Sequence, residues 1–181
     1  MPLCLEIGPA KNRRTFEKST TMDCTSRVGV DIVATWGEKL DIPDNTYDYI
    51  YASHVLEHVP WNKVDFALEE AYRILRSSGR LEVWVPDFQK IVEVYLSGKF
   101  PPENWIPFND ERSLMKWVAG RLFYGVGDEA SSCHRSCFDA NYLVERFERA
   151  GFSKARSLAY PPATQPVNHM FINLGVIGYK Q

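Results

Sequence analysis

The sequence predicts an α/β domain with a mostly parallel sheet whose final strand is antiparallel. Short apolar segments alternate with polar turns and helical patterns over residues 3–96, which is typical of a sheet whose strands are joined by helices. The last helical pattern is followed by two apolar segments with no helix between them, so that pair should be antiparallel. A chain of 181 residues suits a single domain, residues 1–181, and is too short for two ordinary ones.

The individual elements follow from hydrophobic patterning. Seven strands are expected, each a short apolar run bounded by turn residues, at residues 3–7, 20–24, 28–34, 47–53, 80–85, 155–160 and 171–179. Apolar residues recur at three- and four-residue spacing over residues 64–75, which predicts a helix. We expect Asn62 to cap its start and Ser77-Ser78-Gly79 to end it. Two more helices are expected over residues 88–96 and 141–150.

Residues at about 98–137 differ from the rest of the chain. They contain Pro101, Pro102 and Pro107 together with several aromatic residues, and show only a short helical pattern. Long irregular segments of compact domains often carry function. We therefore expect a lid or insertion within the domain.

Composition and charge exclude several classes of protein. Lys plus Arg is 21 and Asp plus Glu is 23, a net charge of −2, and nucleic-acid binders usually carry a basic surplus. No apolar run approaches the roughly 18–20 residues of a membrane span. The first charges follow a short apolar run, the reverse of a secretory signal, and four cysteines are too few for a disulfide scaffold. We expect a cytoplasmic protein with no nucleic-acid partner, and the sequence leaves its oligomeric state open.

Several segments together resemble a known family. They are LEIGPA at residues 5–10, DIPDNTYDYIYASHVLEHV at 41–59, AYRILRSSGRLEVWVPD at 71–87 and FYGVGDEASSCHRSCFDANYLVERFERAGF at 123–152. In this order and spacing the chain resembles a class I S-adenosylmethionine-dependent methyltransferase of the type 11 branch. The resemblance implies a seven-stranded Rossmann-like methyltransferase sheet with helices on both faces, and S-adenosylmethionine as the cofactor.

The residues that follow the first two strands are the first cofactor candidates. Gly8 and Pro9 form the turn after the first strand, where a glycine lets the backbone approach a ligand, although the pair also suits a plain strand-ending turn. The family usually shows more glycines here. The resemblance implies that Glu6 faces the methionine end of the cofactor and that Asp23 binds the ribose hydroxyls, with Asp31 as the competing acid.

The adenine side departs from the family pattern. Thr35-Trp36-Gly37 stands where the family often has an acid, so a backbone carbonyl or the Thr35 hydroxyl would replace it. Trp36 would pack either on the adenine ring or in the core. Ser53 and His54 close the fourth strand and should lie at the cofactor's edge.

Histidines supply the candidate catalytic bases. His54, His58 and His134 have suitable ordinary pKa values, and we favour His134, then His58, because lids usually carry acceptor chemistry. We expect no metal. The His54-x-x-Glu57-His58 motif would need a helix, which a strand end does not supply, and the Cys133–Cys137 spacing is unusual for zinc.

The expected function is methyl transfer from S-adenosylmethionine to a small-molecule, sugar or glycan-like acceptor. The acceptor should be recognised by residues of the lid and by the proline-rich residues 161–169. The main alternative is a methyltransferase fold that has lost activity and serves as a binding or scaffold protein. A nicotinamide-dependent oxidoreductase would carry a G-x-G-x-x-G loop, which this chain lacks. A metal-dependent hydrolase would be supported by the His and Cys residues alone.

Overall fold

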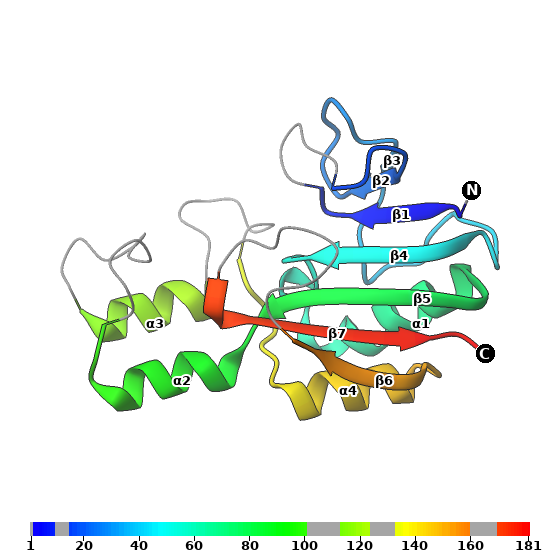
Figure 1. The fold of residues 1–181 in the computed structure, drawn as a ribbon. Coiled ribbons are helices and arrows are strands. Elements are labelled where there is room, and N and C mark those ends of the chain that lie inside the picture. The colour runs from blue at the N-terminus through cyan, green and yellow to red at the C-terminus, as the bar shows by residue number, and fades with distance from the viewer. Residues whose placement is uncertain (1, 10–14, 101–112, 124–132, 160–169) are drawn as a thin grey trace.

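The computed structural model describes residues 2–9, 15–100, 113–123, 133–159 and 170–181. Its seven strands form one sheet in the order β3-β2-β1-β4-β5-β7-β6 (Figure 1). Strands β1 to β5 are parallel to one another, and β7 runs antiparallel to both β5 and β6. The predicted mostly parallel sheet with an antiparallel final strand is confirmed. The strands are β1 (Cys4–Ile7), β2 (Thr20–Asp23), β3 (Ile32–Val33), β4 (Tyr47–Ser53), β5 (Leu75–Pro86), β6 (Ser153–Leu158) and β7 (Asn173–Tyr179).

Helices α1 and α4 pack against one face of the sheet. Their buried apolar residues form a single core with inward-facing strand residues such as Ile50, Leu81 and Val176. The opposite face carries an aromatic cluster of Tyr49, Tyr51 and Trp84, because alternate residues of a strand point to opposite faces. The α-helices are α1 (Val64–Ile74), α2 (Phe88–Ser97), α3 (Leu114–Phe123) and α4 (Ala140–Arg149).

Helices α2 and α3 pack against each other beyond the carboxyl end of β5 (Figure 1). A second, smaller core joins them, with Ile91 from α2, Trp117 and Val118 from α3, and Ile172 from the 3₁₀ turn η5 (Met170–Ile172). Asp87 caps α2 by accepting hydrogen bonds from the backbone N–H groups of Gln89 and Lys90. None of the described helices has the length and apolar character that a bilayer crossing requires.

Three predictions about element boundaries were wrong. The third strand is only two residues long because residues 27–30 form a turn, in which Val30 N–H donates to the Arg27 carbonyl. Helix α1 ends at Ile74, since Leu75 is already extended and opens β5. Asn62 is not the N-cap of α1, because it lies inside the 3₁₀ turn η2 (Trp61–Lys63) that precedes the helix.

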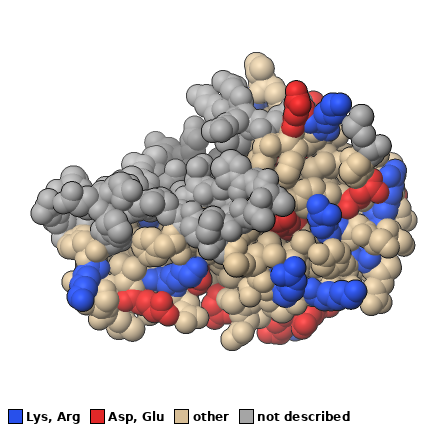
Figure 2. Space-filling model, in the orientation of Figure 1, with Lys and Arg blue, Asp and Glu red and all other residues tan. Residues whose placement is uncertain are grey.

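Surface charge agrees with the near-zero net charge. Basic and acidic side chains are interspersed over the described surface in the face shown in Figure 2. Of the predicted lid at about 98–137, the described parts are residues 98–100, 113–123, which contain α3, and 133–137. Residues 101–112 and 124–132 lie outside the described residues, as do 161–169 of the proline-rich segment.

Candidate active site

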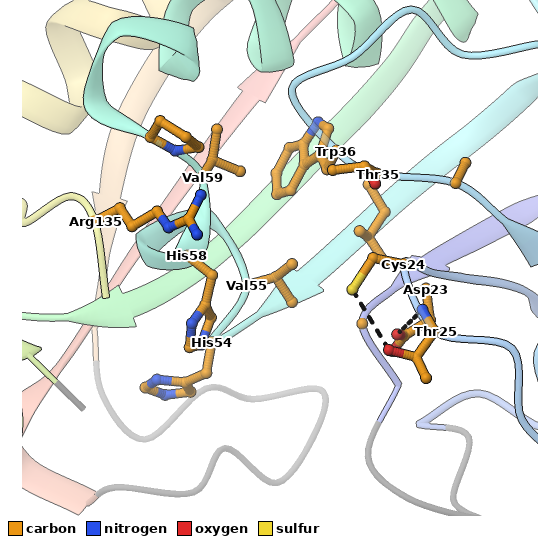
Figure 3. Close-up of a pocket in the computed structure, with 14 residues that line it drawn as sticks. Asp23, Cys24, Thr25, Thr35, Trp36, His54, Val55, His58, Val59 and Arg135 are labelled. Atoms are coloured by element: carbon orange, nitrogen blue, oxygen red, sulfur yellow. Dashed lines mark hydrogen bonds between the residues drawn. The ribbon is translucent and has the colours of Figure 1, made fainter. Parts of the chain in front are cut away.

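A cavity of about 510 Å³ opens at the carboxyl ends of β1, β2 and β4 (Figure 3). Ligands of open α/β sheets bind at this edge. In Figure 3, Asp23 and its neighbours lie opposite His54, His58 and Arg135, with Trp36 between the two groups. The lining residues come from the three strand ends, from the segment after β3, and from the segment before α4: Ile7, Gly8, Asp23, Cys24, Thr25, Ala34, Thr35, Trp36, His54, Val55, His58, Val59, Pro60 and Arg135.

Gly8 is required by the geometry of this cavity. Its φ is +66°, a conformation that costs an L side chain free energy, and a Cβ added there would lie 2.3 Å from Val55 Cγ2. Its backbone N–H donates to the Met22 carbonyl at 2.8 Å, so the turn is held against β2. The Gly8-Pro9 turn therefore brings bare backbone up to the cavity.

Asp23 and Asp31 occupy different positions. Asp23 lines the cavity; its Oδ1 accepts a hydrogen bond from Thr25 N–H at 2.9 Å, and its Oδ2 pairs with Arg27. Asp31 instead accepts hydrogen bonds from the Thr21 N–H and hydroxyl at 2.9 and 3.0 Å, which ties it to β2. Of the two acids, Asp23 is therefore the one placed to meet a ligand.

Trp36 is both a core residue and a cavity wall. Its indole N–H donates to the Ala67 carbonyl of α1 at 2.8 Å, and the side chain is buried in the main core. Thr35 beside it is exposed, and its carbonyl accepts from Glu38 N–H at 3.1 Å. The adenine contacts expected of Thr35 and Trp36 remain predictions.

Three predicted cofactor residues do not line the cavity: Glu6, Pro9 and Ser53. The buried Glu6 carboxylate accepts hydrogen bonds from the N–H and hydroxyl of Thr15, at 2.9 and 2.6 Å, and from Ser19 Oγ at 3.2 Å. In this structure Glu6 thus holds the chain that returns from β1 to β2, and its role toward the cofactor remains a prediction.

A second cavity of about 200 Å³ adjoins the first, and His54 and His58 line both. It is lined by polar groups from three parts of the chain together with three small or apolar residues: His54, Glu57, His58, Pro86, Gly120, Arg121, His134 and Ile172. Glu57 and His58 lie in the 3₁₀ turn η1 (Leu56–His58), directly after β4.

His54 joins the end of β4 to β7. Its φ is +56°, which is uncommon for a residue other than glycine and typical of functional sites. Its Nδ1 hydrogen bonds to Glu57 Oε1 at 3.1 Å and its Nε2 to Asn173 Oδ1 at 2.8 Å. The ring is thereby fixed at the boundary of the two cavities.

His58 and His134 are both held by a hydrogen bond from Nδ1 to a backbone carbonyl. The Nδ1 of His58 lies 3.2 Å from the Cys133 carbonyl oxygen, and the Nδ1 of His134 lies 3.0 Å from that of Arg121. A carbonyl oxygen only accepts, so each Nδ1 carries a proton and donates it. The two rings meet edge to face, with centroids 4.8 Å apart.

Residues 133–137, the last part of the predicted lid, are docked on η1 by backbone hydrogen bonds. The Glu57 carbonyl accepts hydrogen bonds from Arg135 N–H at 2.7 Å and from Ser136 N–H at 3.1 Å, and Ser136 Oγ donates to the Val59 carbonyl at 2.6 Å. These bonds bring Arg135 to the larger cavity, a position that no sequence pattern indicated. They also carry His134 to Glu57, 77 positions earlier in the chain.

Burial and charge shift the pKa values of this cluster. Burial alone would raise the pKa of Glu57, but the His54 hydrogen bond and the neighbouring histidines outweigh it and lower that pKa below its ordinary value. Burial lowers the pKa of His134, and the Glu57 carboxylate opposes this only partly. The resting cluster therefore combines an ionised carboxylate with a neutral His134 at neutral pH.

Comparisons with known proteins indicate the family and the fold. Residues 9–83 match the family model described as a methyltransferase domain. Two matching relatives are named ubiquinone/menaquinone biosynthesis C-methyltransferase UbiE: that of Hydrogenovibrio crunogenus is 34% identical over 71% of this chain and 47% of its own, and that of Methylobacterium nodulans is 27% identical over 58% and 46%. The chain spans about half the length of these curated relatives.

Over the matched residues 9–83 the chain carries the methyltransferase domain that its sequence resembles. Solved methyltransferases share its fold. A possible histamine N-methyltransferase of Thermotoga maritima superposes with a TM-score of 0.58 at 19% identity, covering 100% of this chain and 83% of that one. The 1,6-didemethyltoxoflavin-N1-methyltransferase of Burkholderia thailandensis was solved with S-adenosylhomocysteine. It superposes with a TM-score of 0.58 at 16% identity, covering 99% of this chain and 71% of that one. The family, the fold and the cofactor expected from the sequence are confirmed.

Proposed function

We propose that this methyltransferase transfers the methyl group of S-adenosylmethionine to a small hydroxylated acceptor held in the histidine-lined cavity. One observation carries the proposal: a cavity of cofactor size, with Asp23 and Gly8 on its wall, adjoins a smaller polar cavity across His54 and His58. Methyl transfer needs two ligands side by side, and this arrangement supplies two neighbouring sites.

The residues of the larger cavity suit the cofactor. Its volume of about 510 Å³ falls within the range of small-molecule sites. The Asp23 carboxylate is a bidentate acceptor for vicinal hydroxyls, bare backbone at Gly8 admits a close ligand, and the Trp36 ring offers an apolar wall. When bound, S-adenosylmethionine supplies an electrophilic methyl group on a sulfonium sulfur.

The protein's own contribution is then position and proton transfer. Holding the two reactants in line accounts for much of the rate of such a displacement. A tautomer that donates from Nδ1 has Nε2 as its acceptor nitrogen, and this holds for His134 and for His58. His134 remains the favoured base for an acceptor hydroxyl, with His58 second.

The acceptor class is supported by the names of the relatives. Two of them are named for ubiquinone and menaquinone biosynthesis, which favours a hydroxylated quinol-type ring over a sugar. A polar wall of His, Glu and Arg side chains suits a ring that carries hydroxyl groups.

Calorimetry tests the cofactor half of the proposal. We expect S-adenosylmethionine and S-adenosylhomocysteine to bind and to raise the unfolding temperature, since a ligand of the native state stabilises it, and NAD to do neither. Failure of both sulfur ligands would overturn the proposal.

Turnover tests the other half. Release of S-adenosylhomocysteine is measured with a set of hydroquinones and, in parallel, with sugars. Transfer to hydroquinones is the expected result, transfer only to sugars would correct the acceptor class, and cofactor binding without any transfer would support the scaffold alternative.

A further inference from the structure

Glu57, His58 and His134 form a cluster that the proposed methyl transfer does not require as a unit. Each offers a ligand atom, and these atoms all lie within 4.8 Å of one another in the smaller cavity. His134 Nε2 lies 3.9 Å from Glu57 Oε1. Two of the groups come from η1 and the third from residues 133–137 at the end of the predicted lid, so only the folded chain assembles them.

The two imidazoles are oriented as metal ligands usually are. A ligating histidine typically donates its other ring N–H to a backbone carbonyl or carboxylate, which fixes the tautomer and aims the remaining nitrogen at the ion. His58 and His134 both donate Nδ1–H to backbone carbonyls, of Cys133 and Arg121. This assigns Nε2 of each ring as the coordinating atom.

Glu57 supplies an independent observation. Its side chain is 1% exposed, and its Oε2 has no hydrogen-bond partner, while Oε1 accepts from His54. A buried carboxylate oxygen without a partner is costly and rare in native proteins. An ion bound at Oε2 would remove that cost.

We propose that Glu57, His58 and His134 bind one divalent transition-metal ion, such as Zn²⁺ or Mn²⁺. Two imidazoles and a carboxylate form a set that favours such ions over Mg²⁺ and Ca²⁺, which prefer oxygen ligands alone. With metal–ligand distances near 2.1 Å the three atoms would approach to roughly 3.5 Å of one another. Since their present separations are at most 4.8 Å, no pair would close by more than about 1.3 Å. Three protein ligands leave a coordination position open toward the cavity, where an acceptor oxygen would bind.

The metal site and the methyl-transfer proposal share His58 and His134, but they are tested separately. Ion binding is measured without cofactor or acceptor, and cofactor binding is measured on ion-free protein. Should the ion bind, His134 and His58 act on the acceptor as ligands of that ion instead of as free bases.

Direct titration tests the site. Chelator-treated protein is titrated with Co²⁺ as a spectroscopic probe, and Zn²⁺ and Mn²⁺ loading is measured by elemental analysis after desalting. We expect about one ion per chain and a visible cobalt band. Glu57→Gln, His58→Gln and His134→Gln should each weaken binding by at least about 100-fold, since changes even to groups behind the ligands cost 10–100-fold.

Two matched variants serve as controls. Glu82→Gln makes the same change at another buried carboxylate, one that accepts from Tyr49 and Trp84 outside both cavities. Cys133→Ser removes the thiol next to His134 but keeps the carbonyl that His58 uses. Both should retain the ion.

Three results would overturn the proposal: no stoichiometric binding by the unmodified protein, binding that survives all three ligand variants, or binding lost in Cys133→Ser. The titration of the unmodified protein decides the matter even where a variant fails to fold, which near-ultraviolet circular dichroism would reveal. Protein that binds S-adenosylmethionine but no ion would refute the metal site alone.

Discussion

The two adjoining cavities are built in different ways. Much of the wall of the larger one comes from short segments at the ends of β1, β2 and β3, where each residue's place follows from its own strand. The smaller one joins Glu57, Arg121 and His134, which belong to three segments far apart in the chain. A site at successive strand ends is thus largely specified by local sequence, whereas a site between a turn and an insertion depends on docking.

Their chemistry differs as well. Asp23 is an acid on the wall of the larger cavity. The other residues that line this cavity are mostly apolar or weakly polar, which suits a cofactor bound by shape and a few hydrogen bonds. The smaller cavity concentrates three histidines, a buried glutamate and an arginine. Perturbed titratable groups in a cleft are a common mark of reacting sites. If the larger cavity binds the cofactor and the smaller one carries the chemistry, single substitutions should change cofactor affinity and turnover separately.

The largest effect is expected from His134→Ala. Loss of this group should lower turnover by about 10²–10⁴-fold, the usual contribution of a positioned acid–base group, and leave cofactor affinity within a factor of about two. Steady-state kinetics and calorimetry on the same preparation check both statements. Cys137→Ser, an exposed change three positions away, is the control. Turnover at the unmodified level would remove His134 from the reaction.

The converse change is Asp23→Asn. Hydrogen bonds to a charged group contribute about 1.5–3 kcal/mol each, so we expect cofactor affinity to fall by about 10–100-fold. Turnover at saturating cofactor should stay within a few-fold of the unmodified protein. Asp31→Asn is the comparison, since that acid is bonded to Thr21 and lies outside the cavity lining. Weaker binding in Asp31→Asn and not in Asp23→Asn would reverse the assignment.

Gly8→Ala tests how closely the larger cavity is packed. Gly8 and Gly98 have nearly the same φ, +66° and +65°, but a Cβ at Gly98 meets nothing within 4 Å, whereas one at Gly8 meets Val55 at 2.3 Å. Both alanine variants carry the backbone cost, and Gly8→Ala should lose about 1–3 kcal/mol more in free energy of unfolding from overpacking. Urea denaturation measures the difference. Equal losses would show that Val55 moves aside freely.

The smallest effect is expected from Thr35→Val. The Thr35 carbonyl already accepts from Glu38 N–H, so the hydroxyl is the group we expect to meet the adenine. A neutral hydrogen bond contributes about 0.5–1.5 kcal/mol net, which predicts a loss of cofactor affinity of roughly two- to tenfold. Thr46→Val, whose hydroxyl donates to the Pro43 carbonyl away from both cavities, should bind normally. Unchanged affinity in Thr35→Val would leave the adenine to a backbone carbonyl.

Residue patterns alone predict the sheet, the order of its elements and much of the larger cavity. Alternating apolar segments predict strands, and residues that follow parallel strands lie at the same edge of the sheet. The sequence could therefore place Gly8, Asp23, Thr35 and Trp36 at the cavity. Local patterns failed where a neighbouring element decided the outcome. The expected end of α1 at Ser77-Ser78-Gly79 is part of β5, because Leu75 already pairs with Tyr47 of β4.

The histidine-lined cavity depends on contacts that form only in the folded chain. In the sequence, His54, Glu57 and His58 formed one group and Cys133, His134 and Cys137 another, and neither had the spacing of a metal site. The fold takes Glu57 and His58 from the first and His134 from the second, because the Glu57 carbonyl accepts the backbone N–H groups of Arg135 and Ser136. Every residue other than proline has the same backbone donor and acceptor, so residue types do not indicate which backbone groups will pair. The pairing of the two segments therefore could not be predicted from the sequence.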